Sequence, residues 1–272
     1  MASSRNPAAS SFIRWFKIAT ANGRPAILGG NDGTFCSQRF GMSLDHYRRR
    51  FQKKGTAEKY ARRFDKGSRA RISAKELRAV ESLLDELPDC GTIVDIPCGA
   101  GRLIPALAAK GRKVQGFDIA APMLEIARLR HGECATFAEA DVRHIPLTDG
   151  SVDCVFCNRL LHHLTDAGER QSVLRELCRV TRRWAVVSFF DYGRWKGLRL
   201  FTRIFKDANT CKEKAPTLAE FTEELRQAGF GIERCVRAGG WWASQSYFVL
   251  HRNDSAAARN GPRTHVQSAR TG

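Results

Sequence analysis

The feature that most limits the fold of this chain is an alternation of short apolar runs with amphipathic segments between residues 92 and 190. The apolar runs are rich in Val, Ile, Phe and Cys, and the segments between them carry apolar residues at every third or fourth position. The predicted strands are 92–96, 113–117, 135–139, 152–157 and 184–190, and the predicted helices are 103–110, 123–130 and 170–180. Repeated βα units need a parallel sheet with helices on both faces. The sequence therefore predicts a doubly wound α/β fold.

An amino-terminal helical cap is predicted for residues 42–85. Two pairs of aromatic residues are four positions apart, as on one face of a helix: Tyr47 with Phe51, and Tyr60 with Phe64. Gly55 and Gly67 stand where each of these helices would end. Ser73 and Glu76 have the spacing of a capping box, which satisfies the free N–H groups of a first helical turn. We therefore expect a helix to begin at Ser73 and to pack one apolar face on the core: Leu77, Val80, Leu83, Leu84 and Leu87.

The carboxyl-terminal part is predicted to close the sheet. Thr217 and Glu220 form a second capping box, and the runs 231–236 and 244–251 flank a pair of glycines, as in a hairpin. The main domain is therefore expected to span residues 86–252.

Both ends of the chain are expected to be poorly ordered. Residues 1–41 form a basic arm, and residues 253–272 form a Ser-, Ala- and Arg-rich tail. The arm is poor in acids and bears Arg and Ser, which also fits an organelle transit peptide, with Met42 as a candidate alternative start.

The charge of the chain favours an anionic partner. Lys and Arg number 45 against 28 Asp and Glu, which gives a formal net charge of +17. Most of this excess lies in the first 85 residues and beyond residue 251, so the middle is nearly neutral. Basic flanks on a neutral body suit nucleic acid or an acidic membrane surface, and general solubilising charge is the alternative.

Cysteine usage predicts a reducing, cytoplasmic compartment. The nine cysteines are odd in number and scattered, no secretory signal precedes them, and no apolar run reaches the roughly 18 to 20 residues that cross a bilayer. Cys154 and Cys157 have the C-x-x-C spacing of a metal or redox site. Residues three apart on a strand face opposite sides, so we expect buried structural thiols and no metal.

A glycine-rich turn follows the first predicted strand. Gly99 and Gly101 let the backbone approach a ligand closely, and the next helix offers free N–H groups. Asp95 ends the first strand, Asp118 ends the second, and Asp141 follows the third. The carboxyl ends of such strands meet at one edge of the sheet, so the three acids predict a nucleoside-binding slot.

Two other nucleotide classes are disfavoured. The dinucleotide fingerprint needs Gly or Ala at position 104, where this chain has Ile104, and the chain has no G-x-x-x-x-G-K-[ST] phosphate loop. The sequence therefore argues against NAD and against nucleoside triphosphates as the ligand.

Three segments resemble motifs one to four of the class I S-adenosylmethionine-dependent methyltransferases, in the same order and spacing: VDIPCGAGR (94–102), GFDIAAPMLEIA (116–127) and EADVRHIPLTDGSVDCVFCN (139–158). The resemblance covers roughly residues 45–250. It implies S-adenosyl-L-methionine as the cofactor and a seven-stranded, mostly parallel Rossmann-like sheet whose last strand is antiparallel.

The resemblance also implies roles for individual residues. The methionine part of the cofactor would lie along Asp95, Gly99 and Gly101, and the ribose hydroxyls would bind Asp118. The remaining implied contacts are Ile119 and Met123 at the adenine faces, Asp141 with the Val142 backbone at the adenine edge, and Asn158 near the sulfonium. Pro97 stands where the family usually has Gly, and proline has no N–H to donate, so one cofactor contact is absent.

His162 and His163 follow the fourth strand, where these enzymes usually meet their acceptor. A neutral histidine there is a candidate general base for a hydroxyl, and helix capping or packing is the alternative role. Asn158 is followed by Arg159 and Leu160, without the proline pair of DNA amino-methylases, which disfavours that reaction.

An insertion at 192–216 occupies the usual place of a substrate lid. The spacing of basic and apolar residues in its segment 194–206 predicts a basic amphipathic helix. Such a helix could bind an anionic membrane surface or pack its apolar face on the core. The sequence thus predicts a methyltransferase for a small-molecule or lipid-like acceptor, with a membrane surface as a candidate partner. The alternatives are an RNA (tRNA or rRNA) methyltransferase and a non-catalytic cofactor-binding regulatory protein, and the oligomeric state stays open.

Overall fold

The computed structural model describes residues 44–190, 216–237 and 245–253. The predicted arm (1–41), the insertion (192–216, apart from Pro216), the turn at residues 239–240 and the tail (253–272, apart from Asn253) lie outside the described residues. The described residues therefore do not include the basic segment 194–206.

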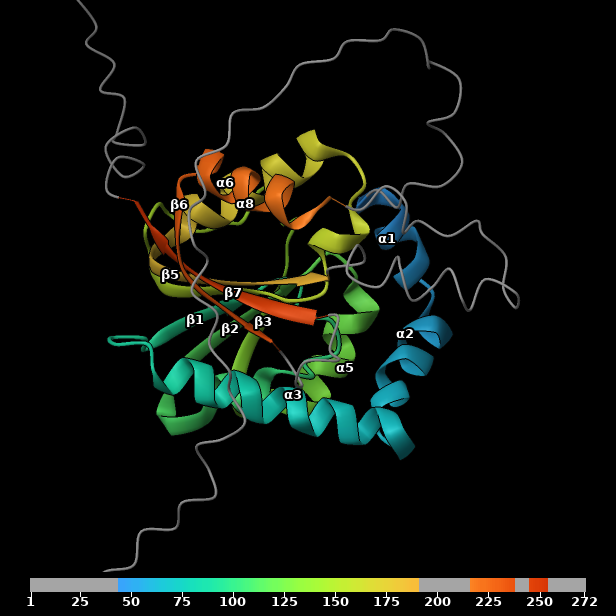
Figure 1. The fold of residues 1–272 in the computed structure, drawn as a ribbon. Helices are drawn as coiled ribbons and strands as arrows, with labels where there is room; N and C mark the ends of the chain where they lie inside the picture. Colours follow the sequence, from blue (N-terminus) through green and yellow to red (C-terminus); the bar gives the residue numbers. More distant parts are fainter. Residues whose placement is uncertain (1–43, 191–215, 238–244, 254–272) are drawn as a thin grey trace, which may run out of the picture.

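A seven-stranded sheet forms the middle layer of the domain (Figure 1). Its strands are β1 (Thr92–Asp95), β2 (Lys113–Asp118), β3 (Ala135–Glu139), β4 (Val152–Cys157), β5 (Thr181–Phe190), β6 (Phe230–Arg237) and β7 (Gln245–Arg252). They are arranged in the order β3-β2-β1-β4-β5-β7-β6. Strands β1 to β5 are parallel, and β7 pairs antiparallel with both β5 and β6. The doubly wound fold and its antiparallel last strand are confirmed.

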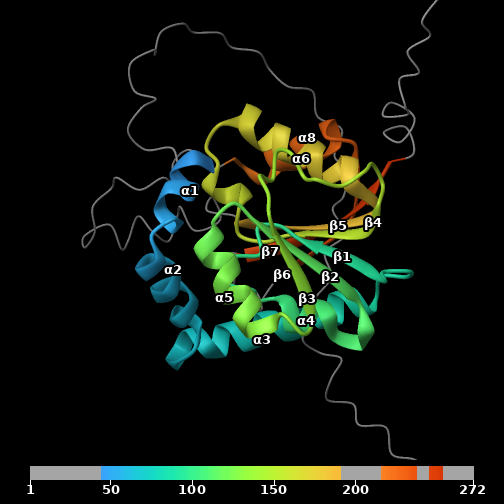
Figure 2. The same cartoon turned by 180° about the vertical axis from the view of Figure 1, so that it is seen from behind.

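Helices cover both faces of the sheet, as Figures 1 and 2 show from opposite sides. One face carries α6 (Ala167–Val180) and α8 (Leu218–Gln227), and the other carries α3 (Gly67–Asp85), α4 (Ile104–Ala108) and α5 (Ala121–His131). Beside these layers lie α1 (Leu44–Phe51) and α2 (Lys54–Ala61), and α2 packs on α5. Short 3-10 turns occur at η2 (Arg62–Phe64), η3 (Ala109–Gly111) and η4 (Leu161–His163).

The sheet separates two apolar clusters, and successive strand residues alternate between them. Cys157 packs in the cluster beneath α6, with Leu174, whereas Cys154 packs in the cluster beneath α3, with Val80. The prediction that the two thiols face opposite sides is confirmed. Within the described ranges all seven cysteines are free, and no group of three or more His, Cys, Asp or Glu is placed to hold a metal. None of the described helices has the length and apolarity to cross a bilayer.

Two helix boundaries differ from the sequence prediction. Helix α3 begins at Gly67, so the capping box at Ser73 was wrong, and Gly67 opens a helix rather than ending one. Gly55 lies in the first turn of α2 and does not stop a helix either. Gly67 has a φ of 68°, which lets the chain reverse after η2 and start a new helix six residues early.

The second capping box is confirmed. Thr217 Oγ accepts a hydrogen bond from the Glu220 N–H, and the Glu220 carboxylate accepts one from the Thr217 N–H at 2.7 Å. The two aromatic pairs predicted in the cap also form, with ring centroids 4.7 Å apart for Tyr47 and Phe51.

Candidate functional site

A cavity of about 410 Å³ lies at the carboxyl ends of β1 and β4. These two strands are neighbours at the point where the strand order reverses, which is where doubly wound sheets bind ligands. The cap supplies the opposite wall through α1, α2 and η2. Six of the predicted site residues line this cavity: Asp95, Pro97, Gly99, Asn158, His162 and His163.

The two loop glycines serve different purposes. Gly99 has a φ of +55°, and a Cβ built on it would meet no atom within 4 Å, so it borders open space. Its N–H donates to Asp118 Oδ2 at 2.8 Å, which ties the loop to the end of β2. A Cβ on Gly101 would lie 2.7 Å from Cδ2 of His131. Gly101 is therefore required for close packing on α5 and does not line the cavity.

Asp95 presents an unsatisfied carboxyl group to the cavity. The residue is 1% exposed, and its Oδ1 atom has no hydrogen-bond partner in the described part of the chain. Burial raises its pKa to about 8, because the nearby Arg102 charge offsets only part of the desolvation. An orphaned buried acceptor beside open space fits a cationic hydrogen-bond donor such as an ammonium group.

The carboxylate predicted for a ribose lies deeper. Asp118 is fully buried and accepts hydrogen bonds from the N–H groups of Gly99 and Ala120 at 2.8 and 2.9 Å. Burial raises its pKa to about 6, although these backbone donors favour the ionised form. Around it lies a second hollow of about 10 Å³, which has room for about one water.

Helix α1 closes this second hollow. Leu44 and Tyr47 line it together with the predicted adenine contacts Ile119, Asp141 and Val142, and Pro97 lines both hollows. Burial raises the pKa of the Tyr47 phenol, and the Asp118 charge adds to that effect. A hollow of this volume does not hold an adenine ring while Leu44 and Tyr47 occupy these positions.

Two residues predicted to contact the cofactor interact with other side chains in the structure. The Asp141 carboxylate binds Arg143, with Oδ2 and Nη2 2.6 Å apart; burial opposes ionisation, but the hydrogen bonds from Arg143 lower its pKa. Met123 is fully buried in a cluster with Phe51 and Ala57 and lines neither hollow.

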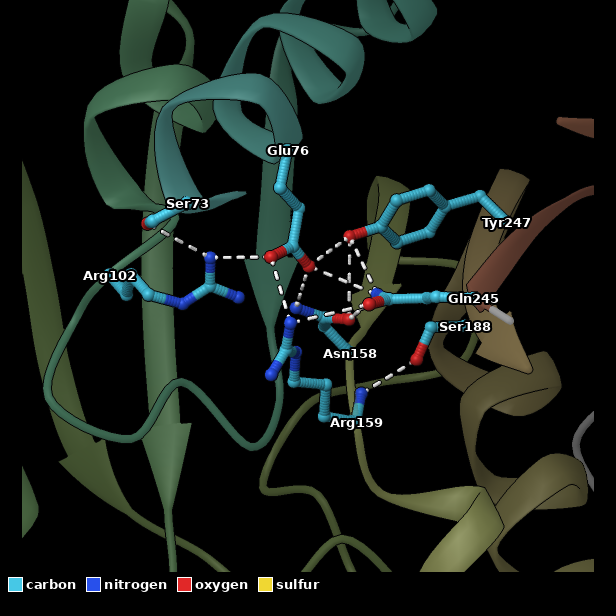
Figure 3. A network of polar contacts seen from close by, with 8 residues as sticks. All are labelled: Ser73, Glu76, Arg102, Asn158, Arg159, Ser188, Gln245 and Tyr247. Atoms are coloured by element: carbon cyan, nitrogen blue, oxygen red, sulfur yellow. Dashed lines mark hydrogen bonds and ion pairs between the residues drawn. The ribbon is translucent and has the colours of Figure 1, made fainter. Parts of the chain in front are cut away.

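Glu76 lies at the centre of a buried polar network that the sequence analysis missed (Figure 3). The residue is 2% exposed, and its carboxylate accepts hydrogen bonds of 2.7 to 3.3 Å from five side chains: Arg102, Asn158, Arg159, Gln245 and Tyr247. Burial alone would raise its pKa, but the two guanidinium groups outweigh burial and lower the pKa to about 2. The network holds Arg102, Asn158 and Arg159 at the cavity wall.

A sequence signal for this network did exist. Glu76 lies four residues before Val80 and therefore on the buried stripe of α3. A lone acid on an apolar helix face indicates a buried partner. Its assignment to a capping box hid that indication.

The two predicted histidines line the cavity beside Phe190. Their rings are 3.9 Å apart between centroids, and Phe190 lies 4.2 Å from the His162 ring. Burial lowers the pKa of His162 to about 2 and that of His163 to about 4, and neighbouring positive charges add to both effects. Both rings are neutral at pH 7 and accept a proton only weakly.

Comparison with known proteins relates this chain to methyltransferases. Residues 93–183 match the family model described as a methyltransferase domain. The malonyl-[acyl-carrier protein] O-methyltransferase of Yersinia pestis is 34% identical over 97 residues, which cover 36% of this chain and 35% of that enzyme. The ubiquinone biosynthesis O-methyltransferase of Bordetella parapertussis is 33% identical over 104 residues, 35% of this chain and 41% of that protein. The chain therefore matches less than half the length of either relative.

Solved structures share the fold. The magnesium protoporphyrin IX methyltransferase of Synechocystis PCC 6803, crystallised with bound SAH, aligns with a TM-score of 0.61 at 21% identity, over 78% of this chain and 100% of that one. A methyltransferase from Aquifex aeolicus described as SAM-dependent aligns with a TM-score of 0.54 at 21% identity, over 74% of this chain and 98% of that one.

Proposed function

Because residues 93–183 form a methyltransferase domain on the class I S-adenosylmethionine-dependent methyltransferase fold, we propose that this chain transfers a methyl group from S-adenosylmethionine to a small-molecule or lipid-like acceptor. The observation that carries the proposal is the unpartnered Asp95 carboxyl beside an open cavity at the switch point of the sheet. The names of two relatives support a small or carrier-bound acceptor, since they refer to malonyl-[acyl-carrier protein] and to ubiquinone biosynthesis.

Two carboxylate acceptors suit the cofactor: Asp95 suits its methionine part, and Asp118 suits its ribose once the small hollow around it opens. Asp95 would accept hydrogen bonds from the ammonium group, Gly99 leaves room for the chain, and Asp118 would accept from the ribose hydroxyls. Bound S-adenosylmethionine supplies an electrophilic methyl group on a positively charged sulfur. Placing the adenine beside Ile119 and Val142 requires Leu44 and Tyr47 to withdraw, so we propose that α1 moves when the cofactor binds.

The raised pKa of Asp95 predicts a pH-dependent affinity for the cofactor. At pH 7 the free protein holds Asp95 mostly protonated, with a pKa of about 8, and the proton must leave before the carboxylate can accept from an ammonium group. Affinity should therefore rise by up to about tenfold per pH unit as the pH increases from 6 towards 8. Calorimetry in two buffers of different ionisation enthalpy should detect the released proton. Asp95→Asn should abolish this dependence, and a wild-type affinity that does not change with pH would contradict the assignment.

An RNA acceptor is the second candidate. The amino-terminal segment exposes a basic surface that includes Arg48 and Lys53, and this surface would suit phosphates. The membrane partner proposed for the segment 194–206, the cytoplasmic location and the non-catalytic regulatory alternative rest on the sequence alone.

One experiment separates these candidates. The protein is incubated with S-adenosylmethionine labelled on its methyl group and with separated lipid, RNA and small-metabolite fractions of a cell extract. We expect label in the metabolite or lipid fraction. Label confined to RNA would favour the second candidate, and cofactor binding without transfer to any fraction would favour a regulatory protein.

A further inference from the structure

We propose that the acceptor is a carboxylic acid, held by Arg50 and Arg159 and methylated on its carboxylate to give a methyl ester. This inference deepens the proposed function and rests on it. Its basis is the arrangement of charged groups around the cavity.

The cavity wall carries an excess of positive charge. Five arginines line it against two aspartates: Arg50, Arg63, Arg102, Arg130 and Arg159, with Asp65 and Asp95. Arg102 is neutralised by Glu76 at 2.8 Å, and Arg130 lies 3.5 Å from Asp65. Arg50 makes no ion pair with any described residue. An anionic ligand would offset this excess.

Arg159 is held rigidly with donor capacity to spare. Its backbone has a φ of +59°, and its N–H donates to Ser188 Oγ at 2.7 Å. Nη2 binds the Glu76 carboxylate and the Gln245 amide, and the guanidinium lies 5.5 Å from the centroid of the Phe64 ring. The Nε–H is buried and has no hydrogen-bond partner among the described residues. A buried unused donor at a cavity wall indicates an acceptor supplied by a ligand.

Arg50 and Arg159 lie on the wall of the same cavity as His163. Each lines the cavity, and the positive charges of both act on the His163 ring, which lies at the end of η4. Two guanidinium groups on the wall of one cavity can bind a planar carboxylate with several charge-assisted hydrogen bonds.

None of the three histidines that line the cavity is a strong base, and Asp95, the lining acid with a raised pKa, is assigned to the ammonium group of the cofactor. Burial holds His131, His162 and His163 in their neutral forms, with lowered pKa values, and raises the pKa of Tyr47. A hydroxyl or ammonium acceptor needs a group to take its proton, whereas a carboxylate is already ionised at neutral pH. The same positive charges that weaken the histidines as bases favour an ionised acceptor.

The reaction balances without proton transfer. A carboxylate oxygen attacks the methyl carbon in line with the carbon–sulfur bond. The new carbon–oxygen bond forms as the carbon–sulfur bond breaks, and the electron pair goes to sulfur. A carboxylate and a sulfonium become a neutral ester and a neutral thioether, so the protein has mainly to hold the two reactants in line.

The bond formed distinguishes this acceptor from others. The wild-type protein is incubated with methyl-labelled S-adenosylmethionine and, separately, with the small-metabolite and lipid fractions, and the labelled product is treated with mild alkali. A methyl ester releases its label as volatile methanol, which is the expected result. Label that survives alkali marks a methyl ether or amine and would overturn the inference while leaving the proposed function intact. Absence of any labelled product would contradict the proposed function itself.

Matched arginine variants test the binding residues. Arg50→Gln should raise KM for the acceptor about tenfold or more, with little change in kcat or in cofactor affinity, because it removes a charge-assisted contact. Arg49→Gln removes the same charge from the next residue of α1, outside the cavity, and should leave KM unchanged. Arg159→Lys keeps a charge but loses the planar fork, so it should also raise KM. Equal KM values for the Arg49 and Arg50 variants would count against the inference, even if the Arg159 variant does not fold.

Discussion

Replacing Glu76 with alanine is expected to lower the free energy of unfolding by about 3 kcal/mol or more. The change leaves Arg102 and Arg159 without their shared carboxylate, and it removes the nearer of two acceptors for the fully buried Tyr247 hydroxyl. A partly buried charge without its partner is costly, and each orphaned hydrogen-bonding group adds to the loss. Urea denaturation at pH 7, followed by circular dichroism, measures the difference.

Two further variants make this test specific. Glu76→Gln preserves the size of the side chain and some of its hydrogen bonds but not its charge. It should therefore lower the free energy of unfolding by less than Glu76→Ala does. Glu81→Ala changes an acid on the same helix outside the network and should shift stability by no more than about 0.5 kcal/mol. If Glu76→Ala proved as mild as Glu81→Ala, the network would not be a major source of stability.

The effect of Glu76 should also depend on pH. The folded protein lowers the pKa of Glu76 from its ordinary value of 4.5 to about 2, so the ionised form contributes stability that is fully present above pH 4.5. This contribution is lost as the pH falls from 4.5 towards 2. The stability difference between wild type and Glu76→Gln should therefore shrink over that interval, and a constant difference would show that the carboxylate charge is not its source.

Asp118→Ala is expected to weaken S-adenosylmethionine binding about 100-fold or more. In the proposed complex the carboxylate accepts hydrogen bonds from the ribose, and in the structure it also holds the Gly99 N–H and so shapes the glycine loop. Hydrogen bonds to a charged group contribute about 1.5–3 kcal/mol each, so losing two of them reaches this magnitude. Isothermal titration calorimetry at pH 7.5 measures the affinity directly, independently of any acceptor.

Glu139, on the neighbouring strand β3, provides a control for the Asp118 variant. Glu139 pairs with Asp118 in the register of β2 and β3, but its side chain is half exposed. Glu139→Ala should change cofactor affinity by less than about threefold, because the charge of a half-exposed side chain is screened by water and salt. Thermal melting must show that both variants remain folded. Unchanged affinity in a folded Asp118→Ala protein would remove the basis for the cofactor assignment.

The fold was predictable because its signals are local. A strand such as 152–157 is marked by a continuous apolar run after an Asp149-Gly150 turn, and the helix after Thr217 is marked by its capping box. The connection rules for parallel strands then leave few arrangements. Cofactor candidates were found in the same way, since Asp95, Gly99 and Asp118 stand at strand ends that the topology brings to one edge.

The local signals failed where contacts with distant segments determine the role of a residue. Ser73 and Glu76 match a capping box, but the reversal at Gly67 starts the helix earlier and turns Glu76 inward. Its hydrogen-bond partner Tyr247 lies 171 residues away in the sequence, so no short pattern could connect them. The weak basicity of His162 and His163 likewise depends on burial by elements that are far apart in the chain.

Periodicity and strand-end chemistry in the chain were thus enough to predict the sheet, most of its helices and the edge at which the cavity lies, because each depends on neighbouring residues. Three features came only from the three-dimensional arrangement: the insertion of α1 over Asp118, the network around Glu76 and the convergence of Arg50 and Arg159 on one cavity. Each joins side chains from separate elements. Desolvation and electrostatic pairing act through space, and only packing decides which charges become neighbours.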